Sequence, residues 1–283
     1  MAQLQRIKIC IIILYCLLYS TFGSPDERRL LKHLPIEQQY NKLERPAQNA
    51  SEPVSVSIGF TLMQIMDFDP KKQVLVTNAW MTLIWQDYSM TWKPQDFGGI
   101  ATIVLPSTTI WIPDIVLYNS VDEKFNSPME TNVVIQHTGD VLYAPRKIFK
   151  SSCSFSTGSI PFDTHSCTLK FGSWTFDSSK INLTFKDEVN DIDVSSYVNN
   201  TEWELKGTSA VRNTMKYDCC PEIYIAIVFT IRISRRSIDY FTTLNDTIKT
   251  NTAGTQHSGN KTKDSKIVNK NKKKFDDMVK KQT

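Results

Sequence analysis

Residues 223–234 read IYIAIVFTIRIS, the clearest alternating run in this chain. Every odd-numbered position from Ile223 to Ile233 is isoleucine or phenylalanine, while the even positions include Tyr224, Thr230 and Arg232. A period of two is the period of a β-strand that has one face on a core and the other turned outward. A charged residue in so short a run also argues against a membrane span, which needs roughly twenty apolar residues. The run therefore predicts a long, half-buried strand.

Other segments upstream of this run also have strand character. Turn residues separate them at 67–70 and at 138–140, where Thr-Gly-Asp stands between two short apolar runs. The predicted strands are Val54–Leu62, Val74–Trp85, Asn132–Ile135 and Val141–Tyr143. Several strands at this spacing predict an all-β sandwich. Between Ser24 and Asn49, helix-compatible residues predict one short helix before the first strand.

The two ends of the chain have different compositions from the middle. Arg6 and Lys8 precede an apolar run at 9–19, which is typical of a secretory signal at residues 1–23. An uncleaved anchor is the alternative, although the run is shorter than a bilayer span. Residues 241–283 are rich in Lys, Asn and Thr and predict a disordered, solvated tail. Residues 24–240 are then the folded domain.

Composition also restricts the class of function. The net charge of +4 is small for 283 residues, and an exported chain rarely meets nucleic acid, so no nucleic-acid partner is expected. Five glycosylation triplets agree with export, at Asn49, Asn182, Asn199, Asn245 and Asn260. The four histidines have neither zinc-site spacing nor a catalytic-triad context, so we expect no metal, no cofactor and no enzyme activity. A secreted hydrolase is a disfavoured alternative.

The chain has six cysteines, of which Cys10 and Cys16 belong to the predicted signal. An oxidising compartment favours disulfides among the other four, and four cysteines allow three connectivities. Those four are Cys153, Cys167, Cys219 and Cys220.

Cys219 and Cys220 are adjacent and lie between Tyr217 and Tyr224. Neighbouring Cα atoms are about 3.8 Å apart, which is less than the usual span of a disulfide. A bond between these two cysteines would close a strained ring at a hairpin tip. Such a ring contributes little to a core, so the pair points to an element that faces a ligand.

Four segments now stand in a recognisable order. They are WIPDIVLYN at 111–119, the loop Cys153–Cys167 with PFD at 161–163, FGSWTF at 171–176 and YDCCPEIY at 217–224. Together they resemble the extracellular ligand-binding domain of nicotinic acetylcholine receptors and the soluble acetylcholine-binding proteins, over about residues 30–236. The resemblance implies an immunoglobulin-like twisted β-sandwich, a ring of five subunits and a ligand site at each subunit interface.

The resemblance also implies the site residues and the disulfide pairs. The principal face of the site would carry Tyr118, Trp174, Tyr217, Tyr224 and the Cys219–Cys220 hairpin. The complementary face, from the neighbouring subunit, would carry Trp80, Val134, Leu142 and Ala144. The pairs would be Cys153 with Cys167 and Cys219 with Cys220, one of the three connectivities.

Aromatic side chains suit such a site for a reason independent of the family. A quaternary ammonium cannot donate hydrogen bonds, but the negative π faces of Trp and Tyr attract it, and Trp174 offers the strongest face. Three other tryptophans are predicted to lie in the core: Trp85, Trp92 and Trp111. Asp114 is expected to support the Trp174 loop through hydrogen bonds as a buried carboxylate. Whether Lys170 pairs with an acid near the hairpin is left open.

The sequence favours a secreted, homopentameric protein that binds acetylcholine or another quaternary or protonated amine. Since the residues after Arg235-Arg236 are polar, no membrane insertion of this chain is expected. The alternative is a truncated receptor subunit of a ligand-gated cation channel, which would act at the extracellular side of a membrane. A sandwich for adhesion, without a ligand, is a further alternative.

Overall fold

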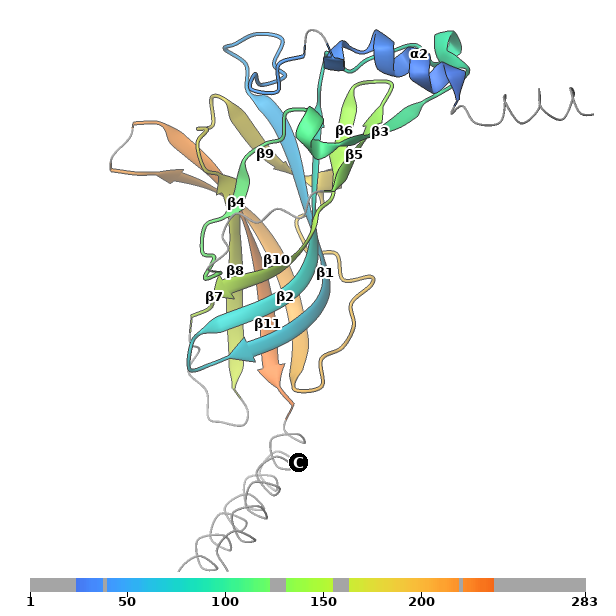
Figure 1. The fold of residues 1–283 in the computed structure, drawn as a ribbon. Coiled ribbons are helices and arrows are strands. Elements are labelled where there is room, and N and C mark those ends of the chain that lie inside the picture. Colours follow the sequence, from blue (N-terminus) through green and yellow to red (C-terminus); the bar gives the residue numbers. More distant parts are fainter. Residues whose placement is uncertain (1–23, 38–39, 123–130, 155–162, 219–220, 237–283) are drawn as a thin grey trace, which may run out of the picture. The chain divides into compact units, whose positions relative to one another are not determined.

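The computed structural model describes residues 24–37, 40–122, 131–154, 163–218 and 221–236 (Figure 1). The predicted signal at 1–23 and the predicted tail at 241–283 lie outside these ranges. So do Cys219, Cys220, Asn245 and Asn260, together with the cysteines of the signal segment.

The predicted short helix is present as α2 (Pro25–His33), followed by the 3₁₀ helix η1 (Pro35–Glu37). The Ser24 hydroxyl accepts a hydrogen bond from the Glu27 amide at 3.4 Å, and Pro25 occupies the first turn. Both features favour a helix start at this point. Leu30 is fully buried and anchors the helix to the core.

The larger sheet has seven strands in the order β3-β5-β6-β2-β1-β9, with β7 also paired to β2. Its long centre is the antiparallel pair β1 and β2, while β9 runs parallel to β1. The strands are β1 (Val54–Asp69), β2 (Val74–Gln86), β3 (Thr102–Pro106), β5 (Asn132–Gln136), β6 (Asp140–Tyr143), β7 (Arg146–Ser152) and β9 (Ile181–Phe185).

The smaller sheet has four strands in the order β10-β11-β8-β4. They are β4 (Ile115–Leu117), β8 (Thr164–Ser173), β10 (Trp203–Lys216) and β11 (Ile223–Arg235), visible beside the larger sheet in Figure 1. Three short 3₁₀ helices lie in the connections: η2 (Pro94–Phe97), η3 (Ser107–Thr109) and η4 (Lys186–Glu188).

Phenylalanines from both sheets meet in the core and make the fold a sandwich. Phe60 of β1 lies 5.2 Å from Phe229 of β11 and 5.6 Å from Phe171 of β8, measured between ring centroids. Phe149 of β7 lies 5.4 Å from Phe171. All four are almost completely buried. The prediction of an all-β sandwich is confirmed.

The three tryptophans assigned to the core are buried there, with exposed fractions of 2 % for Trp85, 6 % for Trp92 and 5 % for Trp111. The alternation of residues 223–234 is also confirmed, since each odd position from Ile225 to Ile233 is buried. Two positions depart from the alternation: Ile223, the first residue of β11, is exposed, and Ala226 on the other face is buried.

The turn predicted at residues 67–70 is wrong. β1 continues to Asp69, and Phe68 and Asp69 pair with Leu75 and Val74 of β2. Phe68 is buried, which keeps this end of the strand in the ladder, and the turn comes after it at residues 70–73. The Asp69 carboxylate starts that turn by accepting from the amides of Lys71 (2.9 Å) and Lys72 (3.0 Å).

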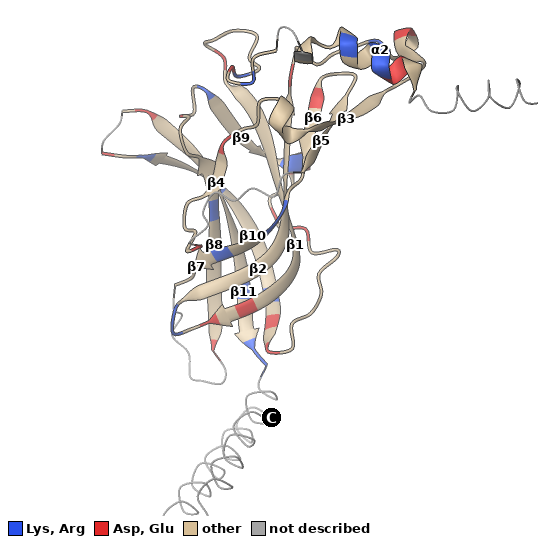
Figure 2. Cartoon of the chain, in the orientation of Figure 1, with Lys and Arg blue, Asp and Glu red and all other residues tan. Residues whose placement is uncertain are grey.

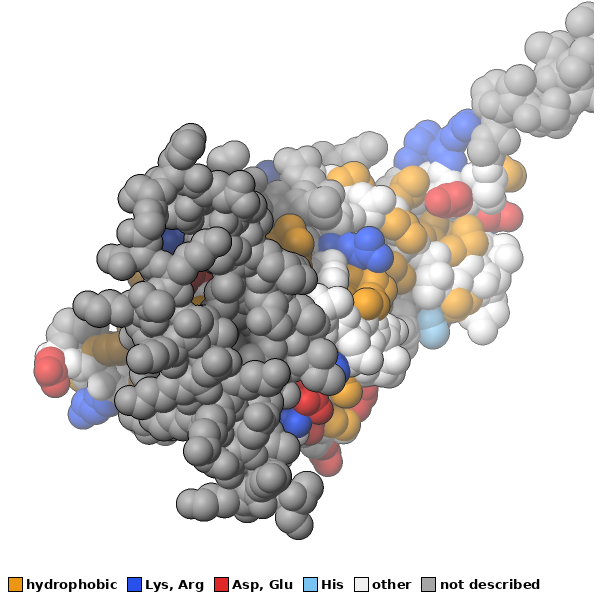
Figure 3. All heavy atoms as spheres, turned by 90° about the horizontal axis from the view of Figure 1, so that it is seen from below, with side chains coloured by type: hydrophobic (Ala, Val, Ile, Leu, Met, Phe, Trp, Pro, Cys, Tyr) orange, Lys and Arg blue, Asp and Glu red, His pale blue; other side chains and the backbone are white. Residues whose placement is uncertain are grey.

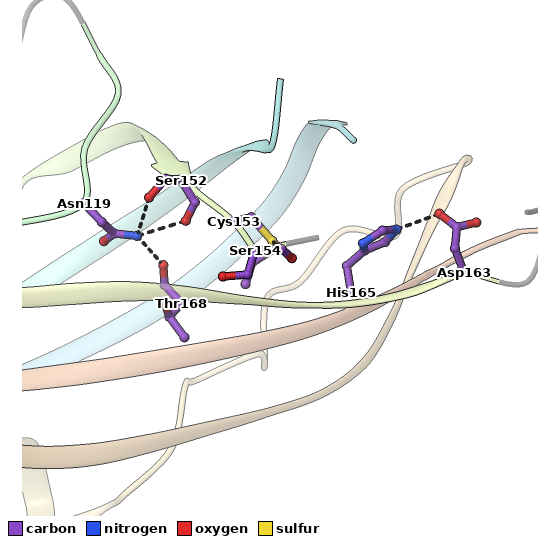
Figure 4. The surroundings of a disulfide bond; sticks show 8 residues. Asn119, Ser152, Cys153, Ser154, Asp163, His165 and Thr168 are labelled. Carbon is purple, nitrogen blue, oxygen red and sulfur yellow. Dashed lines mark hydrogen bonds and ion pairs between the residues drawn. A yellow bond between two sulfur atoms is a disulfide. The ribbon is translucent and has the colours of Figure 1, made fainter. Parts of the chain in front are cut away.

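A disulfide joins Cys153, next to the end of β7, to Cys167 of β8. This confirms the first predicted pair. The Asn119 amide lies nearby and donates to the carbonyls of Ser152 (3.0 Å) and Thr168 (2.8 Å), as Figure 4 shows. The disulfide and this amide together link the end of β7 to β8.

Positively and negatively charged residues occur along strands of both sheets (Figure 2). Seen from below, the coloured part of the surface shows hydrophobic and charged side chains interspersed (Figure 3). No helix in the described part of the chain is both long enough and apolar enough to cross a bilayer.

Candidate ligand-binding site

Tyr118 and Trp174 form the first aromatic pair of the candidate site. Each stands directly after a strand of the smaller sheet, β4 and β8, and these strands pair as Ile115 with Ser173. The Tyr118 amide donates to the Lys170 carbonyl at 2.8 Å, and its hydroxyl donates to the Ser173 carbonyl at 2.6 Å. The two rings meet edge to face, with centroids 6.2 Å apart.

Gly172 makes room for this arrangement. A Cβ at this position would overlap with the hydroxyl and ring carbons of Tyr118. The missing side chain therefore lets the Tyr118 ring lie across β8 and reach the Ser173 carbonyl. The glycine of the FGSW segment is thus part of the site's construction.

Asp114 organises the turn that carries Trp174. Its carboxylate accepts hydrogen bonds from the Ser173 hydroxyl (2.5 Å), the Thr175 amide (2.8 Å) and the Thr175 hydroxyl (2.5 Å). The Trp174 amide donates to the Asp114 carbonyl at 3.3 Å. The hydrogen bonds predicted for Asp114 are therefore present, although its side chain is half-buried rather than buried.

Tyr217 and Tyr224 form the second aromatic pair, on either side of the hairpin between β10 and β11. Tyr224 is opposite Met215 in the ladder, and its ring centroid lies 5.5 Å from that of Tyr217. Tyr217 is 44 % exposed and Trp174 is 64 % exposed. Such large exposed rings contribute little to the core, and their faces are accessible to a ligand.

Tyr118 is close enough to the second pair for both of its tyrosines to influence the Tyr118 pKa, and we treat the two pairs as one aromatic cluster. Burial, with smaller contributions from the nearby Tyr217, Asp114 and Tyr224, raises the pKa of Tyr118 to about 12. The Tyr118 hydroxyl is therefore a neutral hydrogen-bond donor at physiological pH. This protonated state is the one that its bond to Ser173 requires.

Three residues predicted for the complementary face lie on the larger sheet, and the fourth, Ala144, directly follows β6 of that sheet. Val134 of β5 is directly opposite Leu142 of β6, which is opposite Ile84 of β2. Trp80 lies four residues before Ile84 and therefore on the same outward face of β2. Val134 and Trp80 are half-buried, while Leu142 and Ala144 are exposed.

The structure thus brings the predicted residues together in two separate groups. Within the described residues, the Trp80 ring contacts none of the four rings on the smaller sheet; its partner is the guanidinium of Arg146, 4.9 Å from the ring centroid. Lys170 forms no ion pair with a described acid. Cys219 and Cys220 lie outside the described residues.

Three of the predicted glycosylation sites are described. Asn49 and Asn199 are exposed, and the Asn49 amide donates to Glu52 at 2.9 Å. Asn182 is half-buried, and its carbonyl oxygen accepts from Arg212 at 3.0 Å. The loop positions are therefore more accessible than the strand position.

A buried charged cluster at the far end of the smaller sheet was not anticipated. His165 Nε2 lies 2.6 Å from Asp163, as Figure 4 shows, and Arg235 Nε lies 3.3 Å from the same carboxylate. Arg235 also pairs with Glu202 and stacks on Trp203 at 4.2 Å. Although burial opposes ionisation of Asp163, the hydrogen bond with His165 and the charge of Arg235 hold its pKa below the usual range. This cluster ties the start of β8 to the end of β11.

Comparison with known proteins identifies relatives. Residues 27–237 match the family described as the neurotransmitter-gated ion-channel ligand binding domain. The chain is 41 % identical over 235 residues to the acetylcholine receptor subunit alpha-type acr-16 of Caenorhabditis elegans, covering 82 % of this chain and 46 % of that protein.

Two further relatives come from an insect and from humans. The acetylcholine receptor subunit alpha-like of Manduca sexta is 39 % identical over 225 residues, or 77 % of this chain and 43 % of that protein. The human neuronal acetylcholine receptor subunit alpha-2 is 41 % identical over 217 residues, or 77 % and 40 %. The chain spans less than half the length of these curated relatives.

Proposed function

This chain belongs to the neurotransmitter-gated ion-channel ligand-binding domain family, and from that premise we propose that it binds acetylcholine or another quaternary or protonated amine. The amine would be held by Tyr118, Trp174, Tyr217 and Tyr224, under the hairpin that carries Cys219 and Cys220. The family is one of ligand-binding domains, not enzymes, so the proposal is binding without turnover.

The observation that carries this proposal is the exposed aromatic cluster on the smaller sheet. Each aromatic face attracts a cation by about 0.5–2 kcal/mol, so four rings supply several kcal/mol before the cost of association is subtracted. The Asp114 carboxylate is occupied by Ser173 and Thr175. The rings, rather than this carboxylate, are therefore the groups available to a cation.

The separation of the two groups supports a site that is completed by a second subunit. Trp80, Val134 and Leu142 lie on the larger sheet, Ala144 directly follows its strand β6, and none of them joins the aromatic cluster of their own chain. A second copy of the chain would bring this face to the cluster, because one chain carries both. The names of the relatives describe them as receptor subunits, which agrees with an assembly of several chains. We propose a homopentamer as the arrangement to test.

Two settings are compatible with this activity. In the first, the protein is secreted and sequesters the amine; in the second, it is the ligand-binding part of a receptor subunit. The disulfide between Cys153 and Cys167 favours an oxidising compartment, and hence an extracellular location, in both. Sequencing of transcripts beyond the codon for Arg236, together with fractionation of medium and membranes, separates the two settings.

Calorimetric titration with acetylcholine tests the proposed binding. We expect Trp174→Ala to weaken binding by about 1–2 kcal/mol, or about five- to thirtyfold, because it removes the strongest aromatic face. The matched control is Tyr88→Ala, which removes an exposed ring (43 %) outside the cluster. Equal affinities for the parent protein and Trp174→Ala, with both folded, would contradict the proposal.

A further inference from the structure

Arg146 stacks on Trp80, the only aromatic residue in the proposed complementary set. It opens β7 directly opposite Trp80 in the ladder with β2, and its guanidinium carbon lies 4.9 Å from the ring centroid. Arg146 is exposed and Trp80 is half-buried. The guanidinium therefore covers one face of the indole from the solvent side of the sheet.

This contact uses the same property of Trp80 that an amine ligand would use. An indole face attracts any cation, so a guanidinium already placed there competes with an ammonium group for it. In the described part of the chain, Arg146 forms no ion pair with a carboxylate. No described acid therefore cancels its charge, and this charge repels a second cation that approaches within a few ångströms.

Arg146 also supplies a chemical group that its neighbours lack. Val134, Leu142 and Ala144 are apolar, and the indole of Trp80 has a single donor. A guanidinium has five N–H donors and accepts nothing. A ligand with a carbonyl or ether oxygen can accept a hydrogen bond from Arg146. An ammonium ion without an acceptor group is only repelled by the positive charge of Arg146.

We propose that Arg146 is a specificity-determining residue of the amine site. It weakens the binding of an ammonium ion that has no acceptor group, and it favours an amine that carries a hydrogen-bond acceptor toward the Trp80 face. This inference depends on the proposed function, because it matters only if that face meets the aromatic cluster of another subunit.

The test compares two probes by calorimetry: tetramethylammonium, which has no acceptor, and acetylcholine, which has an ester. Arg146→Gln removes the charge and keeps a planar polar group, whereas Arg146→Lys keeps the charge. We expect Arg146→Gln to bind tetramethylammonium about three- to tenfold more tightly than the parent protein, with acetylcholine unchanged or weaker. Arg146→Lys should bind tetramethylammonium as the parent protein does.

Lys147→Gln is the matched control. It removes the same charge from the next residue of β7, whose partner in the ladder is the buried Ala79, so its side chain leaves the strand on the opposite face. We expect its affinity for tetramethylammonium to equal that of the parent protein. Raising the salt concentration should reduce the difference between Arg146→Gln and the parent protein, because salt screens an exposed charge.

The outcomes separate the two proposals. If the parent protein binds acetylcholine and Arg146→Gln matches it for both probes, the role of Arg146 is overturned and the proposed function stands. The role of Arg146 is also overturned if Lys147→Gln raises the affinity for tetramethylammonium as much as Arg146→Gln does. The same holds if Arg146→Gln raises the affinities for tetramethylammonium and acetylcholine equally. If the folded parent protein binds neither probe, the proposed function itself fails.

Discussion

The hydroxyl of Tyr118 donates a hydrogen bond to the carbonyl of Ser173 at 2.6 Å, across the ladder between β4 and β8. This bond joins the residue after one strand to the last residue of the other. Because Trp174 follows Ser173 directly, the bond also helps to fix the backbone position from which the exposed indole extends. The aromatic cluster thus depends on backbone geometry as much as on ring chemistry.

Gly172→Ala tests this dependence. The added methyl group would overlap with Tyr118, so the ring must move and lose its bond to Ser173. We expect a loss of about 1–3 kcal/mol in the free energy of unfolding, together with weaker binding of acetylcholine. Urea denaturation and calorimetry measure the two effects.

Gly59→Ala is the control for this substitution, since Gly59 is also a strand glycine. Its added Cβ would meet the flexible Lys186 side chain at 3.2 Å and Thr82 at an ordinary contact distance of 3.7 Å. Gly59→Ala should change the free energy of unfolding and the affinity for acetylcholine much less than Gly172→Ala does. A Gly172→Ala protein with the stability and affinity of the parent protein would show that the close approach of Tyr118 is unimportant.

Asp114→Ala tests the support of the Trp174 turn. The change leaves the Ser173 and Thr175 donors without their acceptor, which costs about 1–3 kcal/mol of stability. Acetylcholine affinity should fall because Trp174 is no longer held in place, and Asp114→Asn should recover part of it by restoring one acceptor. Intrinsic tryptophan emission reports the environment of the indole. Unchanged affinity in the alanine variant would remove Asp114 from the supporting role.

The buried cluster around Asp163 predicts a dependence of stability on pH. Its pKa is lower in the folded protein than the unfolded value of about 3.9, so its ionised form stabilises the fold above that value. This contribution is lost as the pH falls from about 4 through the folded pKa. Asp163→Asn should therefore lower stability at pH 7 and flatten its decline on acidification, in urea titrations from pH 7 to pH 3.

Arg235→Gln provides a second variant at the same cluster, because it removes one of the groups that lower the pKa of Asp163. The folded pKa of Asp163 then moves toward its unfolded value, so Arg235→Gln should also lower stability at pH 7 and flatten the decline on acidification, less than Asp163→Asn does. If both variants follow the parent curve, the cluster does not control acid stability.

Replacing Cys153 and Cys167 together by serine tests the disulfide. A cross-link that closes a loop of this length, with a sequence separation of 14, stabilises a fold by about 3 kcal/mol. The double variant should show that loss in urea denaturation. A reducing agent should then lower the stability of the parent protein toward that of the variant. Equal stability of the oxidised parent protein and the variant would contradict this prediction.

Some parts of the fold were predictable because they depend on neighbouring positions. Alternation along β11 identified its buried face, and the core positions of Trp85, Trp92 and Trp111 followed from the preference of large rings for the interior. The turn at residues 67–70 was mispredicted because the prediction followed the polar residues and Pro70 of this segment and gave no role to Phe68. Burial of that ring extends β1 to Asp69.

By itself, the sequence determined the all-β class, the short first helix and the identity of the aromatic residues, because period and composition are local properties. Only the tertiary structure decided that Tyr118 crosses Gly172 to reach Ser173, and that Arg146 covers Trp80. Both contacts join residues from different strands. Strand register and sheet order create such contacts, and no local pattern in the chain encodes those distances.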